Sequence, residues 1–400
     1  MTGESPLSMM RAAPAPTRRR APAPRRGQLS RLFVPLGAVI VIGIGWCWLW
    51  YYAAAIAGRT EAAWIEREAA LGRIYACGSQ EIGGFPFSIV SRCTQAAARF
   101  NNNQPPFDVR ATDVTFSAQV FRPTLLNGEI TGPVTLANPG GSPVFTVNWT
   151  RAQMSLLGLP PEPERIAVSL EAPQLDRVAG PASGMIFKAD SVEFDGRIVQ
   201  GSARDNPVIE ATGHFVGAMA PSFHPLLAAP LQGDIDAVMR GFKDFAPKPW
   251  PVLFREMQAS GGGIEIKSLR IERPDSVIIG SGTLTVNGHG RLDGLINVAI
   301  AGIENIVPLL GVDQLIGQGI NRLTGGSGSP EQGLGTLDRL MPGLSGVVRE
   351  NAASGVISNI KKMGQPTEID KKPAIALPLR VDDGIIYLGL IPLGVMPALF

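Results

Sequence analysis

The sequence predicts a mainly β protein of the α+β class: an N-terminal transmembrane helix followed by a large curved antiparallel β-sheet with helices packed across it. Residues 32–58 form an uncharged apolar run. Beyond residue 75, apolar and polar residues alternate in short segments separated by turn residues, as in antiparallel strands with one buried face. We count roughly twelve or more such segments, and open twisted sheets rarely exceed about ten strands without curling, splitting or closing.

The apolar run has the length and flanking residues of a membrane anchor. As a helix it would be roughly 40 Å long, enough to cross a hydrocarbon core of about 30 Å with tilt. Its C-terminal half is rich in aromatic residues, as expected of a membrane-interface belt: Trp46, Trp48, Trp50, Tyr51 and Tyr52. Arginines precede the run and predict a cytoplasmic N-terminus: Arg18, Arg19, Arg20, Arg25, Arg26 and Arg31.

We therefore expect a single-pass anchor in a bacterial inner membrane, with the main domain in the periplasm. The tail at residues 1–31 mixes arginine with proline and is expected not to fold. A cleaved signal peptide and a buried helix of a soluble domain are the alternatives. The signal peptide is disfavoured because its apolar core spans only about 7–15 residues and ends in small residues.

The positive charge of the chain belongs to the tail. The formal net charge is +2, from 36 basic and 34 acidic residues. Residues 1–31 hold seven arginines and one acid, which leaves 29 basic against 33 acidic residues in the remainder. A mildly acidic domain argues against nucleic acid as a partner, because binding a duplex requires a basic face.

Three cysteines are present, and two of them lie on the translocated side. Cys77 and Cys93 are expected to form a disulfide, because an oxidising compartment favours pairing. Closing this loop would stabilise the fold by roughly 3 kcal/mol. Cys47 lies within the apolar run. The histidines show no ligand spacing, so we expect no metal site: His214, His224 and His289.

Residues 59–400 are expected to form one periplasmic β-rich domain. An amphipathic helix at 59–73 continues the anchor, and a helical insert interrupts the strands at about 222–260. Further helices are predicted at about 303–323 and 334–362, joined by a Gly- and Ser-rich linker at 324–333. A final hairpin at 374–394 turns at Asp383-Gly384.

No segment carries a convincing catalytic motif. The nucleophile-elbow, P-loop and dinucleotide patterns are absent from the sequence. Ser358 and Lys361 match S-x-x-K, but the motifs that accompany it in penicillin-recognising enzymes are missing. The pair Asp234 and Asp236 has no motif around it. We therefore expect no enzyme, no catalytic residue and no cofactor, with a hydrolase of unrecognised site as an alternative.

The segment from Tyr75 to Cys93 carries a family resemblance. It contains Gly84-Phe85-Pro86-Phe87 between its two cysteines and follows a helix with Trp64. It resembles the domain-of-unknown-function family 2125, found mainly in alphaproteobacteria, which has no established activity and so implies no catalytic residues. It is also similar, more loosely, to AsmA-like envelope proteins, whose β-rich grooves are linked with lipid handling. Phe85 and Phe87 point to the same side of an extended segment, so the motif is expected to staple the first strand to the core.

Some strands are apolar on both faces, including 277–282 and 385–395. An apolar concave side would enclose acyl chains, whereas ordinary helix-on-sheet packing explains the same pattern without a ligand. We therefore expect an envelope protein that binds lipid or another apolar molecule. The alternative is a scaffold that docks a protein partner through the sheet edge or the helices at 303–323.

Overall fold

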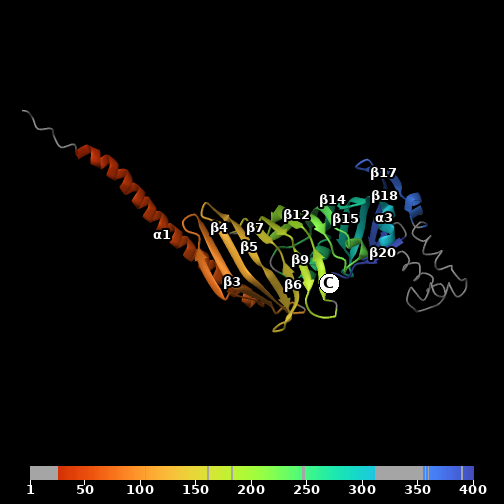
Figure 1. Ribbon diagram of the computed structural model, residues 1–400, viewed down its shortest axis with the longest axis horizontal. Helices are drawn as coiled ribbons and strands as arrows, with labels where there is room; N and C mark the ends of the chain where they lie inside the picture. Colours follow the sequence, from red (N-terminus) through yellow and green to blue (C-terminus); the bar gives the residue numbers. More distant parts are fainter. Residues whose placement is uncertain are drawn as a thin grey trace, which may run out of the picture. The chain divides into compact units, whose positions relative to one another are not determined.

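The computed structural model describes residues 26–103, 105–159, 162–181, 183–245, 248–310, 355, 357–358, 360–388 and 391–400. These residues belong to two compact units, residues 1–52 and 53–400. A helix, α1 (Arg26–Ala70), runs through the boundary between the units. Twenty strands of the second unit form one sheet in which every pairing is antiparallel (Figure 1), so the predicted fold class is confirmed.

Helix α1 contains both the predicted anchor and most of the amphipathic segment that follows it. It begins at Arg26, six residues earlier than predicted: residues 26–34 contain no proline, and their glycine, Gly27, lies in the first turn of the helix. Pro35 lies within it. The described helix is long and apolar enough to cross a membrane. The tail arginines Arg18, Arg19, Arg20 and Arg25 lie outside the described residues.

The strands follow the chain in a meander with one side branch. Their bounds are β1 (Arg73–Ala76), β2 (Ser79–Gly83), β3 (Ser88–Phe100), β4 (Phe107–Gln119), β5 (Arg122–Ala137), β6 (Pro143–Asn148), β7 (Arg151–Leu157), β8 (Arg165–Glu171), β9 (Gln174–Arg177), β10 (Gly184–Lys188), β11 (Ser191–Ser202), β12 (Asp205–Ala218), β13 (Leu231–Arg240), β14 (Gly263–Arg273), β15 (Ser276–Val286), β16 (Leu292–Ala301), β17 (Gln365–Ile369), β18 (Lys372–Asp382), β19 (Ile385–Leu388) and β20 (Ile391–Val395).

The main path of pairing runs from β3 through β4, β5, β7, β8 and β11 to β16, and then to β18. The first half of β5 pairs with β7 and its second half with β6. Strand β6 then pairs with β9, and β9 with β10. The side branch of β6, β9 and β10 therefore continues the sheet beyond the point at which β5 changes its partner from β7 to β6.

We call the break in the strand ladders at this level the crease. It interrupts them at eight neighbouring places that lie side by side across the sheet. At Gln95 and Ala172 the backbone takes the left-handed conformation, with φ of 50° and 48°. The ladders resume on both sides of the crease, so it bends the sheet without ending it, as β-bulges do. The residues at the crease are Cys77–Gly78, Gln95, Thr112, Gly132–Pro133, Trp149–Thr150, Ala172–Pro173, Ala189–Asp190 and Gly217–Ala218.

Among the described residues, the helices after α1 pack on the sheet toward its C-terminal end. The predicted helical insert is only partly helical: η1 (Pro225–Leu227) and α2 (Trp250–Ala259) form, but strand β13 of the main sheet lies between them. Met257 of α2 is buried beside Ile209 and Val286. Short helices α3 (Ile303–Ile306) and η2 (Val307–Leu310) pack against β15, β16 and β18. The rest of the predicted 303–323 helix, the linker 324–333 and most of 334–362 lie outside the described residues.

Candidate functional site

The sheet has one apolar face, formed by rows of directly opposed residues that cross many strands. A middle row contains six large apolar side chains and two glycines, one residue from each strand that it crosses. Its members from β4 to β14 are Phe116, Gly128, Met154, Val168, Phe194, Gly213, Ile235 and Leu269. Directly opposed residues of paired strands point to the same side of a sheet, so all of these side chains lie on one face.

Two further apolar rows flank the middle row on this face. One contains Ala118, Leu126, Leu156, Ile166, Gly196, Ala211, Ala237 and Ile266. The other contains Leu170, Val192, Phe215, Gly233 and Ile271. Gly233 makes room for its neighbour, because a Cβ there would lie 2.6 Å from Cζ of Phe215. We call these the three apolar rows.

Helices contact the apolar rows at their two ends. At the first end the middle row continues to Ser91 and Ile82. There the Ser91 hydroxyl donates to Glu61 of α1 at 2.9 Å. At the other end α3 and η2 lie over Ile278, Val298, Ile300 and other members of β15, β16 and β18, and Val307 is fully buried.

Between β4 and β13 the rows are partly open: side chains of the middle row are exposed or half-buried, whereas Ala211 and Ala237 of a flanking row are buried. None of their residues there belongs to the three buried clusters of the described chain. Phe194 is 40 % and Ile235 36 % exposed, and Met154 and Val168 are half-buried. Seven strands at about 4.8 Å spacing make this open stretch roughly 29 Å long. A partly exposed apolar sheet face of this size is a candidate binding surface.

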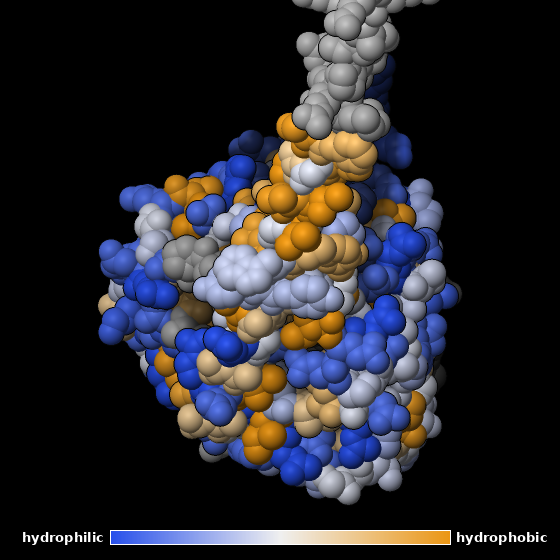
Figure 2. Space-filling model, turned by 90° about the vertical axis from the view of Figure 1, so that its left-hand side faces the viewer, coloured by the Kyte–Doolittle hydropathy of each residue, from blue (hydrophilic) through white to orange (hydrophobic). Residues whose placement is uncertain are grey.

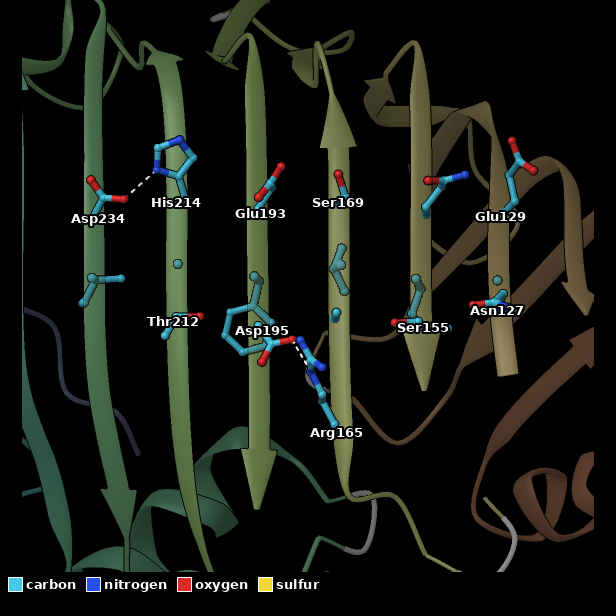
Figure 3. Close-up of a pocket in the computed structure, with 18 of the residues that line it drawn as sticks. Asn127, Glu129, Ser155, Arg165, Ser169, Glu193, Asp195, Thr212, His214 and Asp234 are labelled. Carbon is cyan, nitrogen blue, oxygen red and sulfur yellow. Dashed lines mark hydrogen bonds and ion pairs between the residues drawn. The ribbon is translucent and has the colours of Figure 1, made fainter. Parts of the chain in front are cut away.

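The opposite face of the same strands is polar and contains a groove of about 880 Å³ (Figure 3). One polar row contains Glu129, Gln153, Ser169, Glu193, His214 and Asp234, and the next contains Asn127, Ser155, Ala167, Asp195, Thr212 and Asp236. Members of the middle apolar row also border the groove, because each is the sequence neighbour of two groove residues.

Hydrogen bonds and ion pairs connect neighbouring strands across this polar face. His214 Nδ1 lies 2.7 Å from Asp234 Oδ1, and Arg165 Nε donates to Asp195 Oδ2 at 2.6 Å (Figure 3). Beside the groove, Lys267 and Arg197 both donate to the Glu210 carboxylate, and these hydrogen bonds lower the pKa of Glu210. The described residues contain no group of three or more potential metal ligands. The groove is therefore suited to water and polar groups, and the apolar rows are the surface suited to an apolar ligand.

The structure confirms the predicted disulfide. Cys77 and Cys93 are bonded, with their Cα atoms 5.4 Å apart, and Cys47 is a free thiol. The bond joins the crease between β1 and β2 to the neighbouring strand β3. Of the S-x-x-K match, Lys361 pairs with Glu304 of α3, which indicates a structural role for this lysine.

The motif at residues 84–87 forms the turn between β2 and β3. Gly84 has a φ of 98°, which favours glycine, and the Phe85–Pro86 peptide is cis. Phe85 is 51 % and Phe87 60 % exposed, so the two rings lie at the surface and are not packed into the core as predicted. The prediction failed because spacing places two rings on one side of the chain but does not say which side faces the core.

The predicted interface aromatics all lie on α1. Trp48 stacks on Tyr52 with ring centroids 5.6 Å apart, and Trp50 meets Tyr51 edge to face. The described turns of the helix present hydrophobic residues to solvent, whereas the face of the β unit in the same view mixes hydrophilic and hydrophobic residues (Figure 2). Their place at a membrane interface stays a prediction.

Sequence reasoning did not find the apolar rows. Alternation within each strand is visible in the sequence, but the register that aligns Phe116 with Met154 and Phe194 depends on the turns and the crease. Phe121, an exposed ring beside Phe87, also carried no signal.

Comparison with known proteins gives a family but no activity. No curated protein and no solved structure matches the chain. A family model described as an uncharacterized protein conserved in bacteria (DUF2125) matches residues 50–397, which is most of the chain. The chain, with the disulfide and the large antiparallel sheet described above, therefore belongs to the DUF2125 family.

Proposed function

We propose that this chain is a membrane-anchored protein of the bacterial envelope that binds lipid acyl chains along the open stretch of its apolar rows, without catalysing a reaction. The observation that carries the proposal is the open stretch itself. Two apolar rows cross from β4 to β13 and the third joins them from β8, and their residues there lie outside the buried clusters of the described chain.

The dimensions of the open stretch suit an acyl chain. At roughly 29 Å, it is longer than half of a hydrocarbon core of about 30 Å, which is the depth that the chains of one leaflet fill. Each methylene moved from water onto such a surface contributes up to about 0.8 kcal/mol when fully buried. Phe194 and Ile235 provide the most exposed contacts.

The polar face supports the same proposal. Its charged and polar side chains favour contact with water on that face of the sheet. An acyl chain would therefore bind only on the opposite, apolar face. The apolar run of α1 supports anchoring beside a bilayer. The disulfide supports an oxidising compartment, for which we propose the periplasm, with the arginine-rich N-terminus in the cytoplasm.

Native mass spectrometry of the full chain extracted in detergent tests the proposal. We expect lipid to co-purify with the wild-type protein, and Phe194→Lys to remove it several-fold, because an ammonium group in the middle row is incompatible with an acyl chain. Glu193→Lys is the matched control: it places the same side chain one residue away, on the polar face.

Equal lipid occupancy in the two variants would contradict the proposal. If Phe194→Lys instead removes a co-purifying protein and leaves lipid unchanged, the apolar rows dock a partner and the chain is a scaffold. Thermal unfolding of both variants checks that each is folded, which we expect because both side chains are exposed.

A further inference from the structure

Two neighbouring turns of the sheet present exposed aromatic rings. Phe85 and Phe87 lie in the β2–β3 turn and Phe121 in the β4–β5 turn, with exposed fractions of 51, 60 and 68 %. The rings of Phe87 and Phe121 are stacked with centroids 6.2 Å apart, and the Val120 amide donates to the Phe87 carbonyl at 3.0 Å. We call these three rings the aromatic tip.

The aromatic tip lies toward the N-terminal end of the part of α1 that belongs to the β unit. Along the β unit, successive helix residues contact the sheet in order: Gly58 at Ile82, Glu61 at Ser91 and Trp64 at Tyr75. Ile82 lies one residue before the end of β2, whereas Tyr75 lies in β1, further from the β2–β3 turn. The turn therefore lies on the side of Gly58, toward the N-terminal end of the helix. The turn extends about 10 Å beyond Ile82 at about 3.3 Å per residue.

Gly58 is also the last residue of the uncharged run, and Arg59 follows it. If α1 crosses a bilayer, the level of Gly58 is the level of the bilayer surface. Phe85 and its neighbours then lie at the boundary between headgroups and acyl chains, where aromatic rings are enriched. Exposed basic side chains accompany them, Arg59 on the helix and Arg122 directly after Phe121, and they suit anionic headgroups.

We propose that the aromatic tip inserts into the surface of the bilayer and forms a second membrane contact beside α1. This inference rests on the membrane anchoring in the proposed function. It also identifies the edge at which lipid would reach the binding surface. The apolar row of Ala118, Leu126 and Leu156 is the nearest of the three to the tip, since Ala118 lies one residue before the end of β4.

Spin labels on the full chain in vesicles of phosphatidylcholine and phosphatidylglycerol test the insertion. Single cysteines are introduced as Phe87→Cys and Phe121→Cys in a Cys47→Ser background that keeps the disulfide. Phe223→Cys is the matched control, because Phe223 is an exposed phenylalanine (70 %) away from the tip, between β12 and β13. Accessibility to oxygen and to a water-soluble nickel chelate gives the depth of each label.

We expect the labels at positions 87 and 121 to lie about 5–10 Å below the headgroup boundary, with several-fold lower nickel accessibility than the label at 223. Equal nickel accessibility at all three positions would overturn the inference. A fourth label, Ile42→Cys within the apolar run, reports on the anchor itself. If position 42 lies in the bilayer while 87 and 121 are aqueous, only the aromatic tip proposal fails. If position 42 is also aqueous, the anchoring on which both proposals rest fails.

Discussion

At the scale of single residues, the disulfide fixes an edge of the sheet where the ladder is interrupted. Cys77 lies in the crease between β1 and β2, and Cys93 lies in β3 next to the break at Gln95. The four- and five-residue edge strands have few ladder hydrogen bonds of their own. The covalent bond therefore holds the start of the sheet where α1 joins it.

Removing this bond should destabilise the β unit. We expect Cys77→Ser combined with Cys93→Ser to lower the free energy of unfolding by about 3 kcal/mol, because the loop that the bond closes in the unfolded chain is released. Denaturant titration of the detergent-extracted protein measures the change. Cys47→Ser is the control and should leave the midpoint unchanged, since this thiol is free.

A second residue-scale prediction concerns Glu210. Its pKa is lowered by hydrogen bonds first from Lys267 and then from Arg197. A carboxylate with a lowered folded pKa stabilises the fold above its unfolded pKa, and this contribution is lost as the pH falls through the folded pKa. Glu210→Gln should therefore reduce the melting temperature at pH 7, and the difference from wild type should shrink as the pH falls below about 4.5.

Glu193→Gln is the comparison for this titration, since Glu193 lies on the neighbouring strand and makes no ion pair among the described residues. A melting-temperature difference for Glu210→Gln that stays constant from pH 7 to pH 3 would contradict the proposed origin of the stabilisation.

At the scale of elements, the crease is the feature that most shapes the sheet. It requires left-handed backbone at several positions, including Ala172 and Gly217 with φ of 48° and 64°. A Cβ at Gly217 would also lie against the Asp190 carboxylate. Ala172 pays a steric cost that a glycine would not.

These two positions should respond in opposite directions to substitution. Gly217→Ala is expected to lower the free energy of unfolding by about 1–2 kcal/mol or more, whereas Ala172→Gly should leave it unchanged or raise it. Ala167→Gly, within regular strand β8, is the control and should cost roughly 0.5–1 kcal/mol. Chemical unfolding of the three variants measures these changes, and a loss at Ala172→Gly equal to that at Ala167→Gly would mean that the crease is unstrained there.

The strands were predicted from the sequence, whereas their irregularities were not. The alternating segments predicted the strands well, and the hairpin about Asp383-Gly384 forms between β18 and β19. The crease was not predicted, because each chain passes through it with different residues: proline in two strands, glycine in others and Gln95 in β3. Its position becomes visible only when the registers of eight strand passages are compared.

The same limit explains the outcome at the candidate site. The disulfide could be predicted because the sequence shows the number of cysteines and indicates the compartment. It places two cysteines, Cys77 and Cys93, on the translocated side. The exposure of Phe85 and Phe87 depends on where α1 and the neighbouring turn lie in space. The apolar rows depend on register across strands as distant in sequence as β4 and β11, and no local pattern determines that register.

At the scale of the whole molecule, the chain combines an apolar helix with a sheet whose two faces differ in polarity. Helix packing covers the sheet near β15–β18, where the sequence predicted ordinary helix-on-sheet packing as one alternative, and the open stretch lies elsewhere on the same face. In the proposed function, a membrane anchor would hold this face near its ligand.

The anchor should be retained in the mature protein. We expect the intact mass of the membrane-extracted chain to include the tail and the apolar run, and the protein to stay in the membrane fraction after alkaline carbonate washing, because the helix is long and apolar enough to span a bilayer. A soluble product that begins near Ala53–Ala55 would identify the run as a cleaved signal peptide.

The central claim, that lipid lies on the apolar rows, is tested most directly by photo-crosslinking at adjacent positions on opposite faces. A benzophenone amino acid is incorporated at position 194 or 193 of the full chain in its native membrane, and lipid adducts are quantified by mass spectrometry after irradiation. Phe194 lies in the middle apolar row and Glu193 on the polar face of the same strand. If lipid lies on the apolar rows, adducts at position 194 will be in large excess over those at 193. Equal adducts at the two positions, or none at 194, would rule out lipid binding on this face.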